Sequence, residues 1–227
     1  MRAAMRYKFC YCVFPRAYSK SFLATLVLMI RCILYPGAKL FVTSGGKEQA
    51  SSILKSKIQE LCHLIPALYQ EIDWSRGKTM EGKDYVKYVF KNGAILDNIA
   101  ARETSRGQRR HGGLMEECVS IDGTILNEVI IPTMNVSRRG AWGDKDENET
   151  LNKSQIYITT AGWKNTFSYD KLIQLLVWEI VKPEQSMILG GTWRIPALVG
   201  LIDKNFVQDL KMDGTFNEMS FAREYES

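Results

Sequence analysis

Hydrophobic and polar positions in the first part of the chain predict strands and helices in turn. Residues 6–14 are aromatic and β-favouring and predict a strand, and residues 20–35 predict a buried apolar helix that ends at Pro36-Gly37. A second strand is expected at 39–43, and apolar residues then recur with a helical period over 47–64. Strand, helix, strand and helix in this order are typical of a parallel α/β sheet.

The rest of the chain continues this pattern. Asn92-Gly93 is a strong turn signal and predicts a hairpin over 85–99. Further strands are expected at 113–119, 155–160 and 186–189, and further helices at 124–131 and 168–181. Pro132 is expected to end the first of these helices, and Ser168 is expected to cap the start of the second. Between them, residues 134–154 are a polar insertion.

The composition is that of a folded domain. Of the 227 residues, 45% are hydrophobic and 24% are charged, which excludes a disordered or collagen-like chain. The net charge of +5 permits a nucleic-acid partner without requiring one. We expect an α/β core over 1–190, with a mainly parallel central sheet flanked by helices, and a C-terminal lid or linker segment over 191–227.

Two classes of function are disfavoured. Five cysteines without a CxxC pair and only two histidines provide no zinc-site spacing, so the thiols are expected to be reduced and mostly buried. The apolar run over 22–30 is interrupted by Arg31, well short of the roughly 20 residues that span a bilayer. A membrane role is therefore not expected.

The segment between the first expected strand and helix reads Phe14-Pro15-Arg16-Ala17-Tyr18-Ser19-Lys20-Ser21. In a phosphate-binding loop, backbone N–H groups at a helix N-terminus hold phosphates, a lysine reaches the β/γ oxygens and a hydroxyl binds Mg²⁺. Lys20 and Ser21 stand where those side chains belong, whereas Phe14 and Ser19 replace the usual glycines. The alternative is a basic turn that caps a core helix.

Two carboxylates, Glu116 and Glu117, follow an apolar strand. A nucleotide hydrolase needs one acid at a strand end to orient Mg²⁺ and a second to polarise the attacking water. Because adjacent residues of a strand point to opposite faces, the strand must break to turn Glu117 toward the γ-phosphate. The alternative is a solvated acidic edge.

Thr159-Thr160-Ala161-Gly162 ends the strand expected at 155–160, where hydroxyls can contact the γ-phosphate or its water. Each of the three elements is a weak signal by itself. All three lie at the carboxyl ends of expected parallel strands, where α/β sheets bind ligands. Their order along the chain (loop, acid pair, threonines) predicts a nucleotide hydrolase.

These elements occur together with three further stretches, Gly45-Gly46-Lys47-Glu48-Gln49-Ala50, Ser105-Arg106-Gly107 and Ser220-Phe221-Ala222-Arg223-Glu224-Tyr225. As an ordered set they resemble the ATPase domain of the large terminase subunit of tailed bacteriophages, the motor that pumps DNA into the capsid. The resemblance implies a P-loop NTPase fold of the additional-strand (ASCE) type, with Walker A and Walker B motifs and with ATP and Mg²⁺ as ligands.

The resemblance also implies residue roles. The loop of Pro15, Arg16, Ala17, Tyr18, Ser19, Lys20 and Ser21 would bind ATP, with Lys20 on the β/γ-phosphates and Arg16 sensing the γ-phosphate. Ser21 and Glu116 would hold Mg²⁺, and Glu117 would be the general base. Thr159 and Thr160 would couple hydrolysis to movement. Arg106 is the candidate for a finger that reaches a neighbouring subunit's nucleotide, with Arg102, Arg109 and Arg110 as rivals.

The implied function is ATP hydrolysis that drives double-stranded viral DNA into a preformed capsid, in the host cytoplasm and not in a secreted protein. The implied partners are double-stranded DNA, the portal protein, the small terminase subunit and further copies of the chain in a ring, a pentamer on the portal. Candidates for sequence-independent contacts to DNA phosphates are Arg109, Arg110, Arg138 and Arg139. With the family's nuclease half absent after residue 227, we expect no DNA cleavage.

Two alternatives stay open. The first is a nucleotide-binding assembly module with little or no hydrolysis, because the loop has no glycine and Glu116 replaces the family's aspartate. The second is another DNA-translocating P-loop ATPase, such as a helicase.

Overall fold

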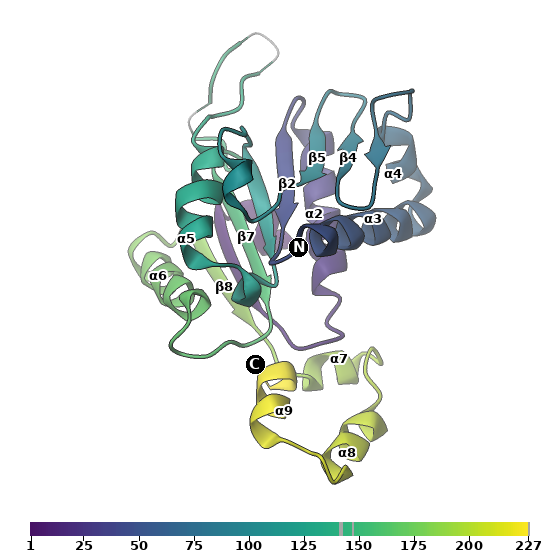
Figure 1. Ribbon diagram of the computed structural model, residues 1–227, viewed down its shortest axis with the longest axis vertical. Coiled ribbons are helices and arrows are strands. Elements are labelled where there is room, and N and C mark those ends of the chain that lie inside the picture. The colour runs from purple at the N-terminus through teal and green to yellow at the C-terminus, as the bar shows by residue number, and fades with distance from the viewer. Residues whose placement is uncertain (141–142, 147, 227) are drawn as a thin grey trace.

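Eight strands form one sheet in the computed structural model, which describes residues 1–140, 143–146 and 148–226 (Figure 1). Their order across the sheet is β3-β4-β5-β2-β6-β7-β1-β8. All neighbouring strands from β5 to β8 pair in parallel, whereas β3 and β4 extend one edge in antiparallel fashion. The strands are β1 (Phe9–Val13), β2 (Lys39–Thr43), β3 (Met80–Glu81), β4 (Val86–Val89), β5 (Ile95–Asn98), β6 (Gly112–Glu116), β7 (Ser154–Thr159) and β8 (Ser186–Gly190).

Helices cover both faces of the sheet. One face carries α1 (Arg2–Arg6), α2 (Lys20–Leu34) and α3 (Lys47–Leu64), followed along the chain by α4 (Pro66–Glu71). The other face carries α6 (Phe167–Val181) and α5 (Gly123–Ile125), which runs on into a π-helical turn (Leu126–Ile130) and a 3₁₀ turn (Ile131–Met134). Shorter 3₁₀ turns occur at Glu103–Ser105 and Cys118–Ser120. The C-terminal segment contains α7 (Arg194–Leu198), α8 (Lys204–Met212) and α9 (Glu218–Tyr225).

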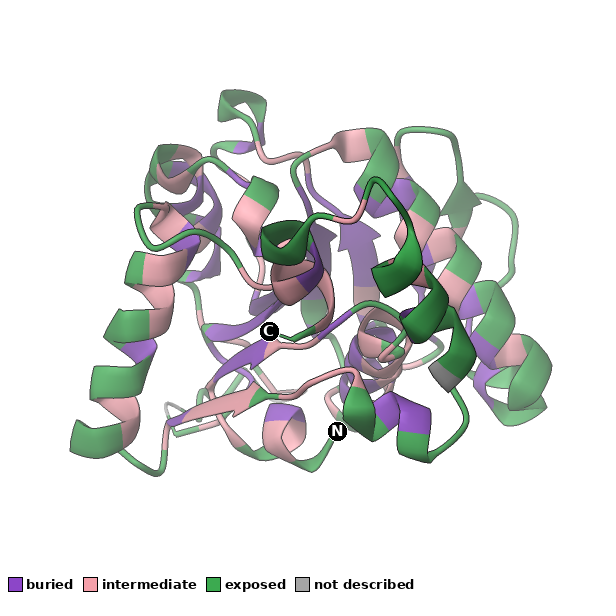
Figure 2. Ribbon diagram, turned by 90° about the horizontal axis from the view of Figure 1, so that it is seen from below, coloured by how far each residue is buried: buried purple, intermediate pink, exposed green. Residues whose placement is uncertain are grey.

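Alternation along the strands divides the interior into two cores. Cys10 and Cys12 of β1 pack toward α2, whereas Tyr11 between them packs toward α6. Leu40 and Phe41 of β2 are divided between the two cores in the same way. Figure 2 shows the result, with buried strands between helices whose outward faces are exposed. Strands buried on both faces explain the near-continuous apolar runs seen in the sequence.

The C-terminal segment has a small hydrophobic cluster of its own. Ala197, Ile202, Val207 and Phe221 are buried together, with Trp193 packed against them. This cluster shares no residue with the two cores of the sheet. In Figure 1 the segment lies beyond the carboxyl ends of the parallel strands.

The mixed α/β architecture with a mostly parallel sheet is confirmed, and β2 and α3 occupy the expected residues. The hairpin is confirmed as β4 and β5, with Gly93 at φ +82° in the turn. The first strand is shorter than expected, because residues 2–6 form α1, which buries Ala4. Likewise β6 ends at Glu116 rather than at residue 119.

Two local expectations were wrong. Pro132 does not end a helix, because it lies in the first turn of a 3₁₀ helix, where its missing N–H is not needed. Ser168 is not an N-cap but lies inside α6, which starts one residue earlier after Thr166. Within the polar insertion, residues 141, 142 and 147 lie outside the described residues.

The apolar run at 22–30 is part of α2, whose neighbour in the core is the sheet. Over the described residues, none of the helices combines the length and the apolar character that crossing a membrane requires.

His111, directly before β6, joins two strands at their amino ends. Its backbone N–H donates to the Lys39 carbonyl at 2.8 Å, and its ring Nδ1 accepts from the Lys39 backbone N–H at 3.0 Å. Burial, followed by the nearby charges of Lys39, Arg138 and Arg110, lowers the pKa of His111 to about 4. The ring is therefore held neutral in the fold while it titrates near 6.5 in the unfolded chain.

We predict that His111 makes stability depend on pH. The unfolded chain binds more protons between about pH 6.5 and 4, so the free energy of unfolding falls as the pH is lowered through this window. Urea unfolding of His111→Gln should show a shallower fall than the wild type, whereas His63→Gln, at an exposed position, should match the wild type. If the free energy of unfolding depended on pH equally in all three proteins, the prediction would be contradicted.

Candidate functional site

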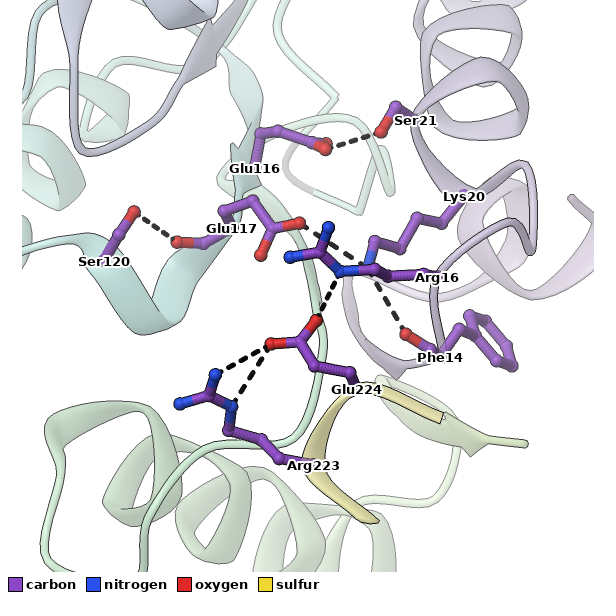
Figure 3. A network of polar contacts seen from close by, with 9 residues as sticks. All are labelled: Phe14, Arg16, Lys20, Ser21, Glu116, Glu117, Ser120, Arg223 and Glu224. Carbon is purple, nitrogen blue, oxygen red and sulfur yellow. Dashed lines mark hydrogen bonds and ion pairs between the residues drawn. The ribbon is translucent and has the colours of Figure 1, made fainter. Parts of the chain in front are cut away.

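A cavity of about 870 Å³ opens at the carboxyl ends of three adjacent parallel strands. Its wall includes residues 16–22 after β1, Glu117 and Ser120 after β6, and Thr160 to Trp163 after β7. The helix α3 and the C-terminal segment contribute the remaining wall. The three sequence elements that predicted a nucleotide hydrolase therefore meet at one place. Figure 3 shows two of them, the loop after β1 and the acid pair.

The loop after β1 makes a tight turn without glycine. Ala17 has φ +59° and Ser19 has φ +54°, both in the left-handed region that glycine normally occupies. The rings of Phe14 and Tyr18 stack with centroids 4.2 Å apart, which closes the turn from the side. Ser19 precedes α2, but among the described residues its side chain makes no capping bond, so its hydroxyl does not hold the helix start.

Lys20, the first residue of α2, points back across the loop. Its Nζ donates to the Phe14 carbonyl at 3.3 Å and lies 3.5 Å from a carboxylate oxygen of Glu117. The lysine side chain is 10% exposed and the glutamate 30%. A partly buried ammonium group at the start of a helix suits an anionic ligand.

Glu116 and Glu117 have separate surroundings. Glu116 is 1% exposed, and its Oε1 accepts a hydrogen bond from the Ser21 hydroxyl at 2.5 Å. Burial raises the pKa of Glu116 to about 7, an effect that the Ser21 hydrogen bond opposes and the charge of Glu117 reinforces. Glu117 lies in the cavity wall beside Lys20 (Figure 3).

The backbone of Glu117 is responsible for this separation. Its φ of +48° places it in the left-handed region, which ends β6 and starts the 3₁₀ turn Cys118–Ser120. The strand break expected from the sequence is thus present. Such a conformation costs a non-glycine residue about 1–3 kcal/mol and persists only where the surroundings hold it. Gly45 leaves room for this 3₁₀ turn, because a Cβ at that position would lie 2.7 Å from Ser120 Oγ.

The threonine pair lies at the end of β7, and both residues are buried. Thr160 lines the cavity, and Thr159 is the last residue of the strand. The Thr159 carbonyl accepts a hydrogen bond from the Phe14 N–H at 3.0 Å. The end of β7 is therefore tied to the start of the loop after β1.

The predicted arginines are dispersed. Arg106 is exposed, does not line this cavity, and pairs with Glu103 and Glu128. Arg110 and Arg138 are partly buried and form ion pairs with Asp97 and Glu149, each at 2.5 Å. Arg109 and Arg139 are exposed. Two of the four arginines expected to contact DNA are therefore engaged within the fold.

The site has the donors that Mg²⁺ prefers. Among the described residues, Glu116 Oε2 is buried without a partner, next to the Ser21 hydroxyl that holds the other carboxylate oxygen. Over residues 1–140, 143–146 and 148–226 there is no group of three or more His, Cys, Asp or Glu that could hold a metal. Mg²⁺ fits nonetheless, because it retains waters and is commonly bound by one or two carboxylates together with substrate phosphates.

Several residues of the cavity wall were not assigned to the site from the sequence. These are Gln49, Lys57 and Glu60 of α3, Trp163, and Arg223 and Glu224 of α9. Arg16 contacts Glu224 across 208 positions of the chain. No short-range pattern signals such a contact, since it depends on how the C-terminal segment folds back.

Neither a family profile nor a curated protein matches the chain. Solved structures do match it. The chain has the fold of large terminase ATPase domains. The ATPase domain of the large terminase of Thermus phage P74-26 superposes with a TM-score of 0.66 at 12% identity, over 97% of this chain and 88% of that one.

Two longer proteins show the same fold. The large terminase of a thermophilic bacteriophage, in complex with ADP, has a TM-score of 0.65 at 10% identity, over 98% of this chain and 48% of that one. The HK97 bacteriophage large terminase has a TM-score of 0.59 at 15% identity, over 96% of this chain and 46% of that one. The chain thus spans about half of these two proteins, and the expected resemblance is confirmed at the level of the fold.

We predict that glycine is tolerated at Ser19, one of the two left-handed positions of the loop. Ser19→Gly relieves the positive φ and should leave the free energy of unfolding unchanged or raise it by up to about 1 kcal/mol. The matched control is Ser52→Gly, at an exposed position inside α3, which should lower it by about 0.5 kcal/mol. Chemical denaturation compares the two, and an equal loss in both would contradict the prediction.

Proposed function

We propose that the chain is an ATP-hydrolysing motor domain that drives double-stranded viral DNA into a preformed capsid, as a large terminase ATPase. The observation that carries the proposal is the pair of contacts between the start of α2 and the end of β6, Lys20 with Glu117 and Ser21 with Glu116. A lysine suited to bind phosphate and a carboxylate suited to activate water thereby line one cavity, which supports the proposal. The fold, shared with a terminase in complex with ADP, supports the proposal.

The strand order supports a P-loop fold of the additional-strand type. The strand β7 lies between β1, which leads into the loop, and β6, which carries the acid pair. We therefore assign the loop of residues 15–21 as Walker A and the end of β6 as Walker B. We also propose that residues 1–190 are the ATPase core and residues 191–227 a lid or linker segment, which has its own hydrophobic cluster.

In this proposal each side chain has a distinct task. Lys20 binds the β/γ-phosphates, and Glu117 accepts the proton of the attacking water. Ser21 and Glu116 hold Mg²⁺, which when bound neutralises charge on the phosphates. Arg16, an exposed residue of the cavity wall, would sense the γ-phosphate. Thr160, also in the wall, would respond to the phosphate, and Thr159, whose carbonyl is bonded to the loop, would pass a shift of β7 to it.

The proposed partners follow from the motor role. They are double-stranded DNA, the portal protein, the small terminase subunit and further copies of the chain in a ring. Arg109 and Arg139 are the exposed candidates for DNA phosphates. Arg110 and Arg138 are better assigned to the stability of the fold, because each is paired with a carboxylate.

We predict Mg²⁺-dependent ATP hydrolysis that needs Lys20 and Glu117. Lys20→Ala and Glu117→Gln should each lower the rate at least 100-fold, because a positioned acid–base group alone contributes about 10²–10⁴. Phosphate release should be measured over a range of protein concentrations with and without DNA, since a ring supplies part of the site. The matched controls are Lys78→Ala and Glu184→Gln, both exposed and outside the cavity.

Wild-type turnover equal to that of the Lys20 and Glu117 variants at every concentration would refute the motor. Nucleotide binding without turnover would support the assembly module instead. Separation of DNA strands would favour a helicase.

We also predict that Arg106 acts on a neighbouring copy. Because it lies outside its own cavity, Arg106→Ala should lower ATP turnover without weakening nucleotide binding. Mixing Arg106→Ala chains with inactive Glu117→Gln chains should restore activity, since the second supplies the arginine and the first an intact cavity. Arg76→Ala, at an exposed turn, is the control. If the mixture turned over ATP no faster than the two variants do separately, action in trans would be contradicted.

A further inference from the structure

The C-terminal helix α9 holds the arginine of the phosphate loop by two contacts. Arg16 Nε donates to Glu224 Oε2 at 2.6 Å, and the Arg16 backbone N–H donates to the Glu224 carbonyl at 3.0 Å. Arg223 donates to the other carboxylate oxygen of Glu224 at 3.0 and 3.2 Å (Figure 3). The Glu224 side chain is only 15% exposed, whereas that of Arg16 is 67% exposed.

Each cation in the cavity wall is paired with a carboxylate of the same wall. Lys20 pairs with Glu117 at 3.5 Å, Lys57 with Glu60 at 2.8 Å, and Arg16 and Arg223 with Glu224. A triphosphate that enters the cavity brings several negative charges to these cations. It must therefore compete with the carboxylates that already neutralise them.

The three carboxylates differ in how readily they can leave. Glu117 is directed by the backbone at the end of β6, and Glu60 lies one turn from Lys57 on α3. Glu224 belongs to a segment with a separate hydrophobic cluster, so it can move away without disturbing the sheet. Glu224 is thus the carboxylate that an incoming phosphate can displace at the lowest cost.

We infer that Glu224 is an internal competitor of the nucleotide: it occupies Arg16 and Arg223 in the free chain and yields them to the phosphates when a nucleoside triphosphate binds. Both arginines then become phosphate ligands, and α9 is released from the loop. This inference rests on the proposed function, because it requires that a triphosphate enters the cavity. It assigns Arg223 as a binding residue and Glu224 as a regulatory residue.

The test is the affinity of the full chain for adenylyl imidodiphosphate with Mg²⁺, measured by calorimetry. Glu224→Gln removes the competing charge and should bind about three- to fivefold more tightly, the effect of one partly exposed ion pair. Glu218→Gln removes the same charge from the first turn of the same helix, away from the Arg16 contact at its other end, and should bind like the wild type. Inorganic tripolyphosphate should show the same gain, because the competition concerns phosphates.

Two further variants exclude a structural role. Glu224→Asp shortens the side chain and should give an intermediate gain, which keeps the test available if Glu224→Gln folds poorly. In an Arg16→Gln background most of the gain from Glu224→Gln should vanish, as expected for two residues that act as one unit. A merely structural contact would instead lower stability and leave affinity unchanged or weaker.

The outcomes separate the two proposals. If wild type and variants all bind the analogue and no Glu224 variant binds more tightly, the competitor role is overturned and the proposed function stands. If none binds the analogue, the proposed function fails, and the competitor role fails with it.

Discussion

A carboxylate buried at the end of β6 constrains most of what surrounds it. Glu116 is 1% exposed, and a charge so placed is unfavourable unless polar groups reach it. The donor that reaches it is Ser21, at the start of α2, so the loop after β1 must pass the end of β7 to bring it there. The same path places Lys20 beside Glu117. One poorly solvated acid thus sets the mutual position of the loop, the helix and the sheet edge.

The parts of this arrangement that could be predicted from the sequence are those with local causes. The period of apolar residues gave the bounds of α3, the short run at 39–43 gave β2, and Asn92-Gly93 gave the hairpin, because these signals act within a few residues. That Lys20 and Ser21 lie close to Glu116 and Glu117 could be predicted, because the carboxyl ends of parallel strands meet at one edge of the sheet. The end of β6 was placed too late, since apolar Val119 continued the pattern while the left-handed Glu117 broke it.

Such reasoning does not predict contacts between residues that lie apart in the sequence. Arg110 and Arg138 look like solvated arginines in the sequence, but Asp97 and Glu149, which partner them, are 13 and 11 positions away. Arg31 is a similar case, fully buried in α2 and bound by Ser154 Oγ and the Ala4 carbonyl. Burial lowers its pKa to about 10. Apolar periodicity identifies a buried face, but it does not identify the polar group that satisfies a cation within it.

The absence of glycine from the loop after β1 has a thermodynamic consequence. Ala17, Tyr18 and Ser19 have fewer backbone conformations open to them in the unfolded chain than glycines would have. The stacked rings of Phe14 and Tyr18 restrict the folded loop further. Ordering this turn on folding therefore costs less backbone entropy than ordering a glycine-rich turn would. A ligand that meets a loop ordered in advance binds with a smaller entropic penalty.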